Sequence, residues 1–477
     1  MDVHQNYIGG RWTPSRSVLP VLNPSDGAKM AEIARGGAAE IDAAVAAGHA
    51  AMKGEWGRMD AVTRGRLMLK FADLIRRDAE KLAKMESEDV GKPMTLARND
   101  AAVCARYFEY YGAAADKVHG ETIPFQTGFS VMTFYEPHGV TAHIVPWNYP
   151  LQMTGRSVAP SLAMGNAIVL KPAEDTSLTA LALARLAEEA GFPAGVFNVV
   201  TGLGEEAGAA LSAHPGVGHV SFTGSREVGV LVQMAAAKNT IPVTLELGGK
   251  SPQVVFADAD FSEAGNTIVR GITQNAGQTC SAGSRVLIED SVYDRFTSEL
   301  ADRFRALRVG SASQDLDLGP VVNATQKKRI ESYLDLARKD GLPILAEGAF
   351  GTNLPEGGYY VKPTLIGDVP PQHRLGQEEI FGPVLVAVRF KDEEDAIRIA
   401  NDTPYGLAAG VWTGNLGRSM RLSHRIQSGQ VFVNNYGAGG GVELPFGGVK
   451  GSGHGREKGF EALYGFAALK TVTIKHG

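Results

Sequence analysis

Between residues 140 and 246 the chain alternates short runs rich in β-branched residues with longer alanine-rich runs, and glycine or proline separates them. This alternation predicts helices between strands, with strands at 140–145, 167–171, 196–200, 219–222 and 242–246 and helices at 151–164, 177–190 and 225–237. Consecutive β-α-β units form right-handed crossovers and build one mostly parallel sheet. The feature restricts the chain to an α/β fold with a Rossmann-like sheet.

The flanking regions predict additional units. Before the alternating region the pattern is mostly helical, at 38–50, 61–77, 79–90 and 97–115. After it, a second α/β series begins with a strand at 253–256. Because 477 residues exceed what one hydrophobic core organises, we expect two or three domains, with a boundary near residue 250.

Two β-prone segments, at 127–135 and 467–475, belong to neither predicted sheet. Such strands pair either with each other or with a second subunit. A glycine cluster at 437–441 is interpreted as a loop.

Charge and composition exclude several classes of partner. The 47 basic and 52 acidic residues give a net charge of −5 without a long block of one sign, so we expect no binding to nucleic acid or to a membrane. No segment has the roughly 20 apolar residues of a membrane span. Two cysteines cannot form a disulfide framework, and we expect a cytoplasmic protein. The eleven histidines show no metal-ligand spacing, so we predict no metal.

Of the two cysteines, Cys280 is the candidate for chemistry. It lies in a small and polar stretch at 277–283 (GQTCSAG), which is untypical of a hydrophobic core and indicates a reactive thiolate. Cys104, among alanines at 101–105, fits a small buried hydrophobic residue.

Two polar residues at predicted strand ends suit acid–base and oxyanion chemistry. Glu246 lies in an otherwise apolar strand end, where burial would raise its pKa as a general base requires; the alternative is a surface-facing edge residue. Asn148, in 146–150 (PWNYP), offers an amide donor of the kind found in oxyanion holes, or it caps a turn before the helix at 151.

Two further strand ends suit a dinucleotide. Gly224 and Ser225 join a strand to a helix, where backbone N–H groups bind phosphate, although such glycines are often only turns. Lys171 and Glu174 follow another strand, and a carboxylate there accepts hydrogen bonds from a ribose. The same carboxylate would repel a 2′-phosphate, which favours NAD over NADP. The alternative is a solvated Lys–Glu pair.

Seven short strings match one known family in order. They are PWNYP (146–150), KPAE (171–174), FTGS (222–225), LELGGK (245–250), GQTC (277–280), EEIFGP (378–383) and PFGG (445–448). On these strings the chain resembles the NAD(P)-dependent aldehyde dehydrogenase superfamily over essentially its whole length.

The resemblance implies roles for four catalytic residues. Cys280 would be the nucleophile, and the Asn148 amide with the Cys280 backbone N–H would hold the oxyanion. Glu246 would activate the water that hydrolyses the thioester, so we expect a free acid as product. Glu457 matches a carboxylate that some members use to relay protons.

The resemblance also implies the cofactor site and the assembly. NAD would be bound, with NADP as the weaker alternative, by Trp147, Lys171, Glu174, Gly224, Ser225, Glu379 and Phe381. The implied fold has an NAD-binding domain (1–116 and 138–249), a catalytic domain (250–451) and a bridging unit (117–137 and 452–477). A homodimer or homotetramer is expected.

The substrate is expected from the helix that follows Asn148, which by resemblance lines the aldehyde tunnel. Tyr149, Met153, Arg156 and Phe446 are the candidate substrate residues. Many members have a large apolar residue where this chain has Arg156, which favours an anionic or polar substrate end; alternatively Arg156 faces solvent or a structural acid. Ser157 replaces a lysine of the relay, which argues against a relay through Glu457. We therefore expect an aromatic aldehyde or a semialdehyde.

Two other functions use the same residues. A non-catalytic structural or binding relative would be expected to lose Cys280 or Glu246, and both are present. A thiol acyltransferase would use the cysteine with a nearby histidine base, and no histidine lies close to Cys280 in the sequence.

Overall fold

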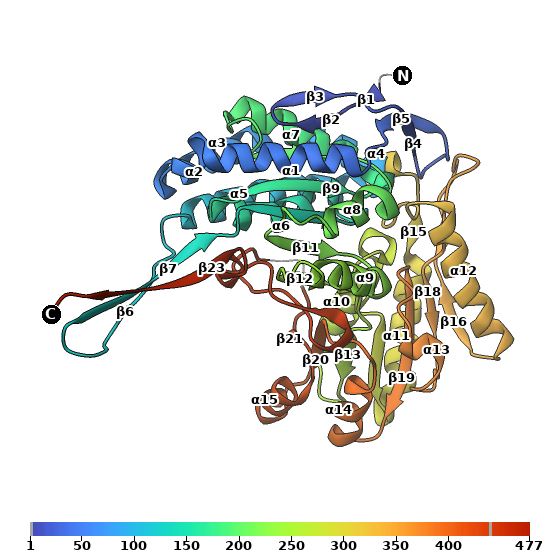
Figure 1. Cartoon of the computed structure of the whole chain (residues 1–477). Helices are drawn as coiled ribbons and strands as arrows, with labels where there is room; N and C mark the ends of the chain where they lie inside the picture. Colours follow the sequence, from blue (N-terminus) through green and yellow to red (C-terminus); the bar gives the residue numbers. More distant parts are fainter. Residues whose placement is uncertain (1–2, 438–440) are drawn as a thin grey trace.

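The first sheet contains the five parallel strands that the sequence predicts. A computed structural model describes residues 3–437 and 441–477 (Figure 1). The sheet has the order β22-β12-β11-β8-β9-β10-β2-β3. Its parallel strands are β8 (Val140–Val145), β9 (Ala167–Pro172), β10 (Phe197–Val199), β11 (His219–Thr223) and β12 (Val243–Glu246). The predicted α/β class is confirmed.

Short strands from the chain ends extend this sheet. The antiparallel pair β2 (Asn6–Ile8) and β3 (Arg11–Thr13) continues one edge, and β22 (Gly453–His454) forms the other. A separate small sheet contains β1 (Val3–His4), β4 (Val18–Leu22) and β5 (Lys29–Ala34). The sequence pattern does not indicate these strands, because segments of two to six residues are too short to show a period.

Helices cover both faces of the first sheet. One face is covered by α1 (Ala38–Lys53), α8 (Ala209–Ser212) and α9 (Arg226–Ala237). The other is covered by α3 (Ala61–Arg77), α4 (Ala79–Val90), α5 (Met94–Ala114), α6 (Pro150–Ala163) and α7 (Leu178–Ala190), with the short α2 (Glu55–Arg58) at the end of α1. Every residue of α6 is buried, because the helix lies between the sheet and α5.

The second sheet has the order β16-β18-β19-β14-β13-β20-β21. Its strands are β13 (Pro252–Val255), β14 (Arg285–Glu289), β16 (Ile344–Glu347), β18 (Thr364–Ile366), β19 (Val384–Phe390), β20 (Ala408–Trp412) and β21 (Gln430–Val433), and a separate pair is β15 (Arg308–Val309) with β17 (Ala349–Phe350). Its helices are α10 (Phe261–Thr273), α11 (Tyr293–Ala306), α12 (Ala324–Lys339), α13 (Arg374–Gln377), α14 (Glu393–Asn401) and α15 (Leu416–Arg425). The chain changes sheets between β12 and β13, which is where the predicted boundary near residue 250 falls.

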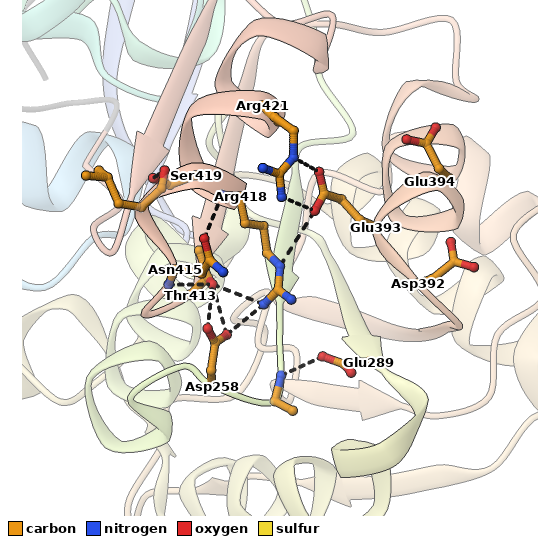
Figure 2. A network of polar contacts seen from close by, with 12 residues as sticks. Asp258, Glu289, Asp392, Glu393, Glu394, Thr413, Asn415, Arg418, Ser419 and Arg421 are labelled. Atoms are coloured by element: carbon orange, nitrogen blue, oxygen red, sulfur yellow. Dashed lines mark hydrogen bonds and ion pairs between the residues drawn. The ribbon is translucent and has the colours of Figure 1, made fainter.

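A polar network joins α14 and α15 to the end of the second sheet (Figure 2). Arg421 donates two hydrogen bonds to Glu393, at 2.6 and 2.8 Å. Arg418 and the Thr413 hydroxyl both donate to Asp258. A bidentate Arg–carboxylate pair fixes orientation as well as distance, so the network sets how α15 lies beside β20 and β21.

The two detached strands pair with each other. In β7 (Phe129–Pro137) and β23 (Ala467–Lys475) all nine residues are matched antiparallel, and β6 (Thr122–Ile123) adds a third strand. This arm projects from the body of the molecule and contains the C-terminus (Figure 1).

The last part of the chain contributes to two sheets. β22 pairs antiparallel with β12 at the edge of the first sheet, and the short α16 (Glu461–Gly465) and β23 follow it into the arm. The domain limits, including the bridging unit at 117–137 and 452–477, stay a prediction.

Two features are absent from the described residues. No helix in residues 3–437 and 441–477 combines the length and apolar character needed to span a bilayer. Within the same residues, no group of three or more His, Cys, Asp or Glu side chains is arranged to hold a metal ion. Of the glycine cluster at 437–441, residues 438–440 lie outside the described part of the chain.

Candidate active site

Two pockets meet at Cys280. The first, which we call the substrate pocket, is lined by Tyr107, Tyr149, Gln152, Met153, Arg156, Arg270, Gly271, Gln274, Thr279, Cys280, Ser281, Tyr436, Gly437, Phe446 and Lys458. The second, the cofactor pocket, is lined by Pro146, Trp147, Asn148, Met153, Thr223, Gly224, Ser225, Arg226, Glu227, Gly248, Cys280, Gln326, Arg329, Glu379, Phe381 and Tyr405. Cys280 and Met153 line both pockets, so the thiol lies where their contents would meet.

A rigid loop presents Cys280. Asn275 and Ala276 adopt positive φ angles of 50° and 52°, which turn the chain sharply after α10. The Gln278 side chain holds this turn, because its amide donates to the Asn275 carbonyl at 3.1 Å and accepts from the Val322 N–H at 2.9 Å. Backbone strain of this kind persists only where the surroundings enforce it.

The Cys280 thiol is protonated at neutral pH. Burial raises its pKa to about 11, and nearby Arg156 opposes that rise only in part. The reactive thiolate that the sequence indicates is therefore a minor form in this site, and the thiol needs a proton acceptor.

The Asn148 amide faces the cysteine loop. Its Nδ2 donates to the Gln278 carbonyl at 2.8 Å, and this uses one of the two N–H groups. The Oδ1 atom is buried and has no partner among the described residues. The alternative role, as a cap of the turn before α6, is not seen: no side-chain cap bond is present at the start of that helix.

Glu246 is a buried carboxylate without a hydrogen bond. It is 1% exposed at the end of β12, and neither oxygen has a partner among the described residues. Burial raises its pKa well above the usual range, although Arg156 partly opposes this. The alternative of a surface-facing edge residue is therefore wrong, because β22 covers this strand end.

Arg156 and Glu457 form a buried ion pair. The Arg156 Nε donates to Glu457 Oε2, and the Ser221 hydroxyl donates to the other Glu457 oxygen at 2.8 Å. Both side chains are almost fully buried. Arg156 therefore faces a structural acid, Glu457, which is one of the alternatives considered for this residue. Because its charge is already paired, the structure argues against direct binding of a substrate anion by Arg156. Ser157 lies next to this pair, donating to Ser221 at 2.9 Å.

Five of the seven expected cofactor residues line the cofactor pocket. Ser225 caps α9 by accepting from the Val228 N–H at 3.3 Å, and it lies beside Gly224 at the helix N-terminus. Trp147 and Phe381 stand edge to face with ring centroids 5.3 Å apart. Glu379 accepts from the Gly249 N–H at 2.9 Å, and burial raises its pKa to about 7.

The other two, Lys171 and Glu174, pair with each other at 3.0 Å just beyond the pocket lining. Lys171 lies in the last part of β9 and Glu174 just after this strand, which is the neighbour of β8, so both lie at the same sheet edge as Trp147. The Lys171 side chain is buried and that of Glu174 is 36% exposed, which differs from a fully solvated pair.

These residues fit a dinucleotide. The cofactor pocket encloses about 880 Å³ of empty space, which includes space open to solvent. Its lining includes the N-terminus of α9, which suits a phosphate, and the Glu379 carboxylate beside Gly248. A side chain at position 248 would collide with that carboxylate, since a Cβ would lie 2.1 Å from Oε2.

All four expected substrate residues line the substrate pocket, and the structure adds others that the sequence analysis missed. Tyr107 and Tyr436 contribute aromatic rings, and Arg270 and Lys458 contribute cations. Tyr436 donates to the Ser281 carbonyl next to Cys280. The sequence offers one indication of these pocket residues: Arg270 lies in the last turn of α10, directly before the cysteine loop.

Comparison with known proteins gives a family for the whole chain. The model of the aldehyde dehydrogenase family matches residues 12–472. The chain is 42% identical over 471 residues to hydroxyisobutyraldehyde dehydrogenase from Mycolicibacterium austroafricanum, covering 98% of this chain and 93% of that protein.

Two solved structures show the same fold. A crystal structure of a candidate aldehyde dehydrogenase from Burkholderia cenocepacia superposes with a TM-score of 0.98 at 58% identity, covering 99% of this chain and 100% of the other. Betaine aldehyde dehydrogenase from Staphylococcus aureus, in complex with NAD+, gives 0.96 at 35% identity, covering 99% and 95%.

The chain therefore belongs to the aldehyde dehydrogenase family. It is an oxidoreductase that uses NAD(P) to oxidise aldehydes to carboxylic acids. The resemblance seen in the sequence is confirmed.

The burial of Glu246 predicts a pH-dependent gain in stability for Glu246→Gln. Because the folded pKa is raised above the ordinary value of 4.5, the native state keeps a proton that the unfolded state has lost, and the free energy of unfolding falls as pH rises through that interval. We expect the variant to melt a few degrees higher than the wild type at pH 8 and at nearly the same temperature at pH 5. Thermal melts at both pH values, with exposed Glu263→Gln as control, measure this; a constant difference across pH would contradict it.

Proposed function

We propose that Cys280 attacks the aldehyde and that Glu246 serves both half-reactions as base. The supporting observation is that Cys280 lies at the junction of the substrate and cofactor pockets. Glu246 is the carboxylate that interacts with both Cys280 and Arg156. An ionised carboxylate of raised pKa is a stronger proton acceptor than an ordinary one.

In the first half-reaction the thiol proton moves to Glu246 and the sulfur bonds to the carbonyl carbon. The carbonyl oxygen becomes an oxyanion, which the free N–H of the Asn148 amide and the Cys280 backbone N–H stabilise. The chemistry that NAD supplies when bound is acceptance of a hydride. The remaining acyl group is then a thioester on Cys280.

Before the second half-reaction Glu246 releases the thiol proton to solvent, and the regenerated carboxylate then takes a proton from water. The hydroxide adds to the thioester carbon, the C–S bond breaks, and the carboxylic acid leaves as the sulfur regains a proton. A relay of that proton through Glu457 is not favoured. Both Glu457 oxygens are bonded, and its partner Arg156 does not give up a proton. We propose instead that Glu457 holds Arg156 beside Glu246.

For the cofactor we propose NAD in preference to NADP. Glu174 is held by buried Lys171 at the sheet edge where an adenosine ribose would lie, and its carboxylate would repel a 2′-phosphate. Gly224 and Ser225 would hold the pyrophosphate, Glu379 the second ribose, and Trp147 and Phe381 the walls of the site.

For the substrate we propose an aldehyde that carries a carboxylate, with or without a ring. No Asp or Glu occurs among the described residues that line the substrate pocket, whereas Arg156, Arg270 and Lys458 do. Since Glu457 neutralises Arg156, the charge available to a substrate comes from Arg270, whose guanidinium has no ion-pair partner in the part of the chain that the structure describes. The rings of Tyr107, Tyr436 and Phe446 suit an aromatic body.

Neither alternative function gains support. A thiol acyltransferase would normally use a histidine base beside the cysteine, and no histidine lines either pocket among the described residues. A non-catalytic relative would not need the buried, unpaired Glu246. The cytoplasmic location stays a prediction.

We further propose a homodimer or homotetramer. On α9 the apolar side chains of Val230, Leu231 and Met234 are 51%, 64% and 62% exposed, a patch typical of subunit contacts. Sedimentation equilibrium is expected to give a dimer or tetramer mass, and Leu231→Glu is expected to lower it. The control Val62→Glu, at an exposed site on α3, should keep the mass. A monomeric wild type would contradict the proposal.

The nucleophile is tested by NADH formation with purified protein, NAD and a panel of aliphatic, aromatic and carboxylate-bearing aldehydes. We expect Cys280→Ala to lose turnover by more than roughly 1,000-fold, and Cys104→Ala to retain it. Glu246→Gln should lose steady-state turnover by about 100-fold or more and should also slow acylation of Cys280, seen by mass spectrometry. Wild-type turnover in Cys280→Ala would overturn the mechanism. The same assay with NADP should give weaker activity.

The substrate proposal is tested by Arg270→Gln. Loss of the cation should raise KM for carboxylate-bearing aldehydes by about 10-fold, which corresponds to about 1.4 kcal/mol of binding free energy, and should leave KM for neutral aliphatic aldehydes unchanged. Arg305→Gln removes an exposed charge outside the pocket and serves as control. An equal change for charged and neutral aldehydes would remove the idea.

A further inference from the structure

A buried ionic cluster lies beneath the Asn148 loop. Lys92 follows α4, where Gly91 turns the chain with a φ of +87°. The Lys92 ammonium is 3.0 Å from Glu86 Oε1 and 2.5 Å from Asp100 Oδ2. None of the three side chains is more than 2% exposed. Each charge therefore depends on its partners, because water does not reach them.

The third Lys92 donor reaches the oxyanion site. An ammonium has three N–H groups, and after Glu86 and Asp100 the remaining acceptor is the backbone carbonyl of Asn148, at 3.0 Å. The amide of Asn275 donates to the same carbonyl at 2.8 Å. The backbone of Asn148 is thus held on two sides, while its side-chain amide faces the Cys280 loop.

Lys92 also contacts Tyr149, whose hydroxyl group touches the loop that carries Cys280. Its ammonium lies 4.3 Å from the centre of the Tyr149 ring, a cation–π distance. The Tyr149 hydroxyl is 2.7 Å from Thr279 Oγ1, and Thr279 precedes Cys280. One buried cation therefore contacts both consecutive residues that face the oxyanion site.

The two carboxylates of the cluster hold the start of α6. Glu86 Oε2 accepts from the Leu151 N–H at 3.2 Å, one of the first N–H groups of the helix, which have no partner within it. Asp100 accepts from the Gln152 amide at 2.5 Å. The cluster thereby fixes where the helix begins and, with it, where Asn148 lies.

We propose that Lys92 is a positioning residue for the oxyanion site, acting through Asn148. The inference rests on the proposed function, in which the Asn148 amide and the Cys280 N–H stabilise the oxyanion. Lys92 touches no reacting atom. Its role is to hold the Asn148 carbonyl and the Tyr149 ring, because a donor displaced by about 1 Å loses much of its effect on rate.

A double-mutant cycle tests this proposal. Lys92→Arg keeps the charge, but a planar guanidinium cannot reproduce three converging ammonium contacts. The assay is hydrolysis of p-nitrophenyl acetate without cofactor: the Cys280 sulfur bonds to the acyl carbon, p-nitrophenolate leaves, and water releases acetate. We expect Lys92→Arg to lower the rate about 10- to 100-fold in the wild-type background, and less than about 3-fold in the Asn148→Ala background.

Two controls separate positioning from folding. Rates are expressed per Cys280 thiol titrated with iodoacetamide, and NAD affinity, measured by tryptophan fluorescence, should match the wild type. Lys84→Arg, on the exposed side of α4, should change nothing. If Lys92→Arg does not fold, Asp100→Asn takes its place in the cycle with the same expectation.

The outcomes are distinct. Equal losses from Lys92→Arg in both backgrounds, or a wild-type rate per titrated thiol, would overturn the positioning role and leave the proposed function intact. A wild-type rate in Asn148→Ala alone would overturn the oxyanion role of Asn148, and the inference with it.

Discussion

The complete burial of α6 is the constraint on which the rest of the site depends. The helix lies between the first sheet and α5, and all of its residues are buried, so it cannot shift without opening the largest core. The residues just before it and along it supply the oxyanion donor, a shared wall of both pockets and the Arg156 half of an ion pair. A helix with a solvated face would leave these groups free to move by the fraction of an ångström that matters for catalysis.

Buried charged side chains around this helix are mostly paired with side chains of opposite charge. Arg156 meets Glu457 and Lys92 meets Glu86 and Asp100, so most of the cost of burial is offset within each group. Glu246, by contrast, has neither a salt bridge nor a hydrogen bond among the described residues. An uncompensated carboxylate lowers stability, yet it is the group whose basicity benefits from that isolation. The carboxylate of Glu246 thus stays without a partner at the place where a base is needed, whereas Arg156 and Lys92 are paired with carboxylates.

The sequence predicts the parallel strands of the first sheet closely, but it does not predict which buried polar side chains pair with each other. Strands β8 to β12 are predicted to within a residue or two, because each is a short apolar run bounded by glycine, proline or a helix. Cys280 and Glu246 stand out through residue type and setting. The partner of Arg156 is not predictable, since Glu457 is 301 positions away and only the tertiary fold brings them together. Likewise Lys92 follows a glycine turn, where a lysine is ordinarily solvated, and its contact with Asn148 has no local signature.

The segment from Val442 onward closes a site whose nucleophile lies in the middle of the chain. Phe446 and Glu457 bridge to each other, β22 covers the end of β12, and the last residues complete the arm with β7. During synthesis the Cys280 region leaves the ribosome long before these elements exist. A nascent chain can therefore assemble both sheets while its thiol still lacks the wall formed by Phe446 and the ion pair made by Glu457. The complete site therefore forms only after residue 457 has been synthesised and its segment has folded back onto the first sheet.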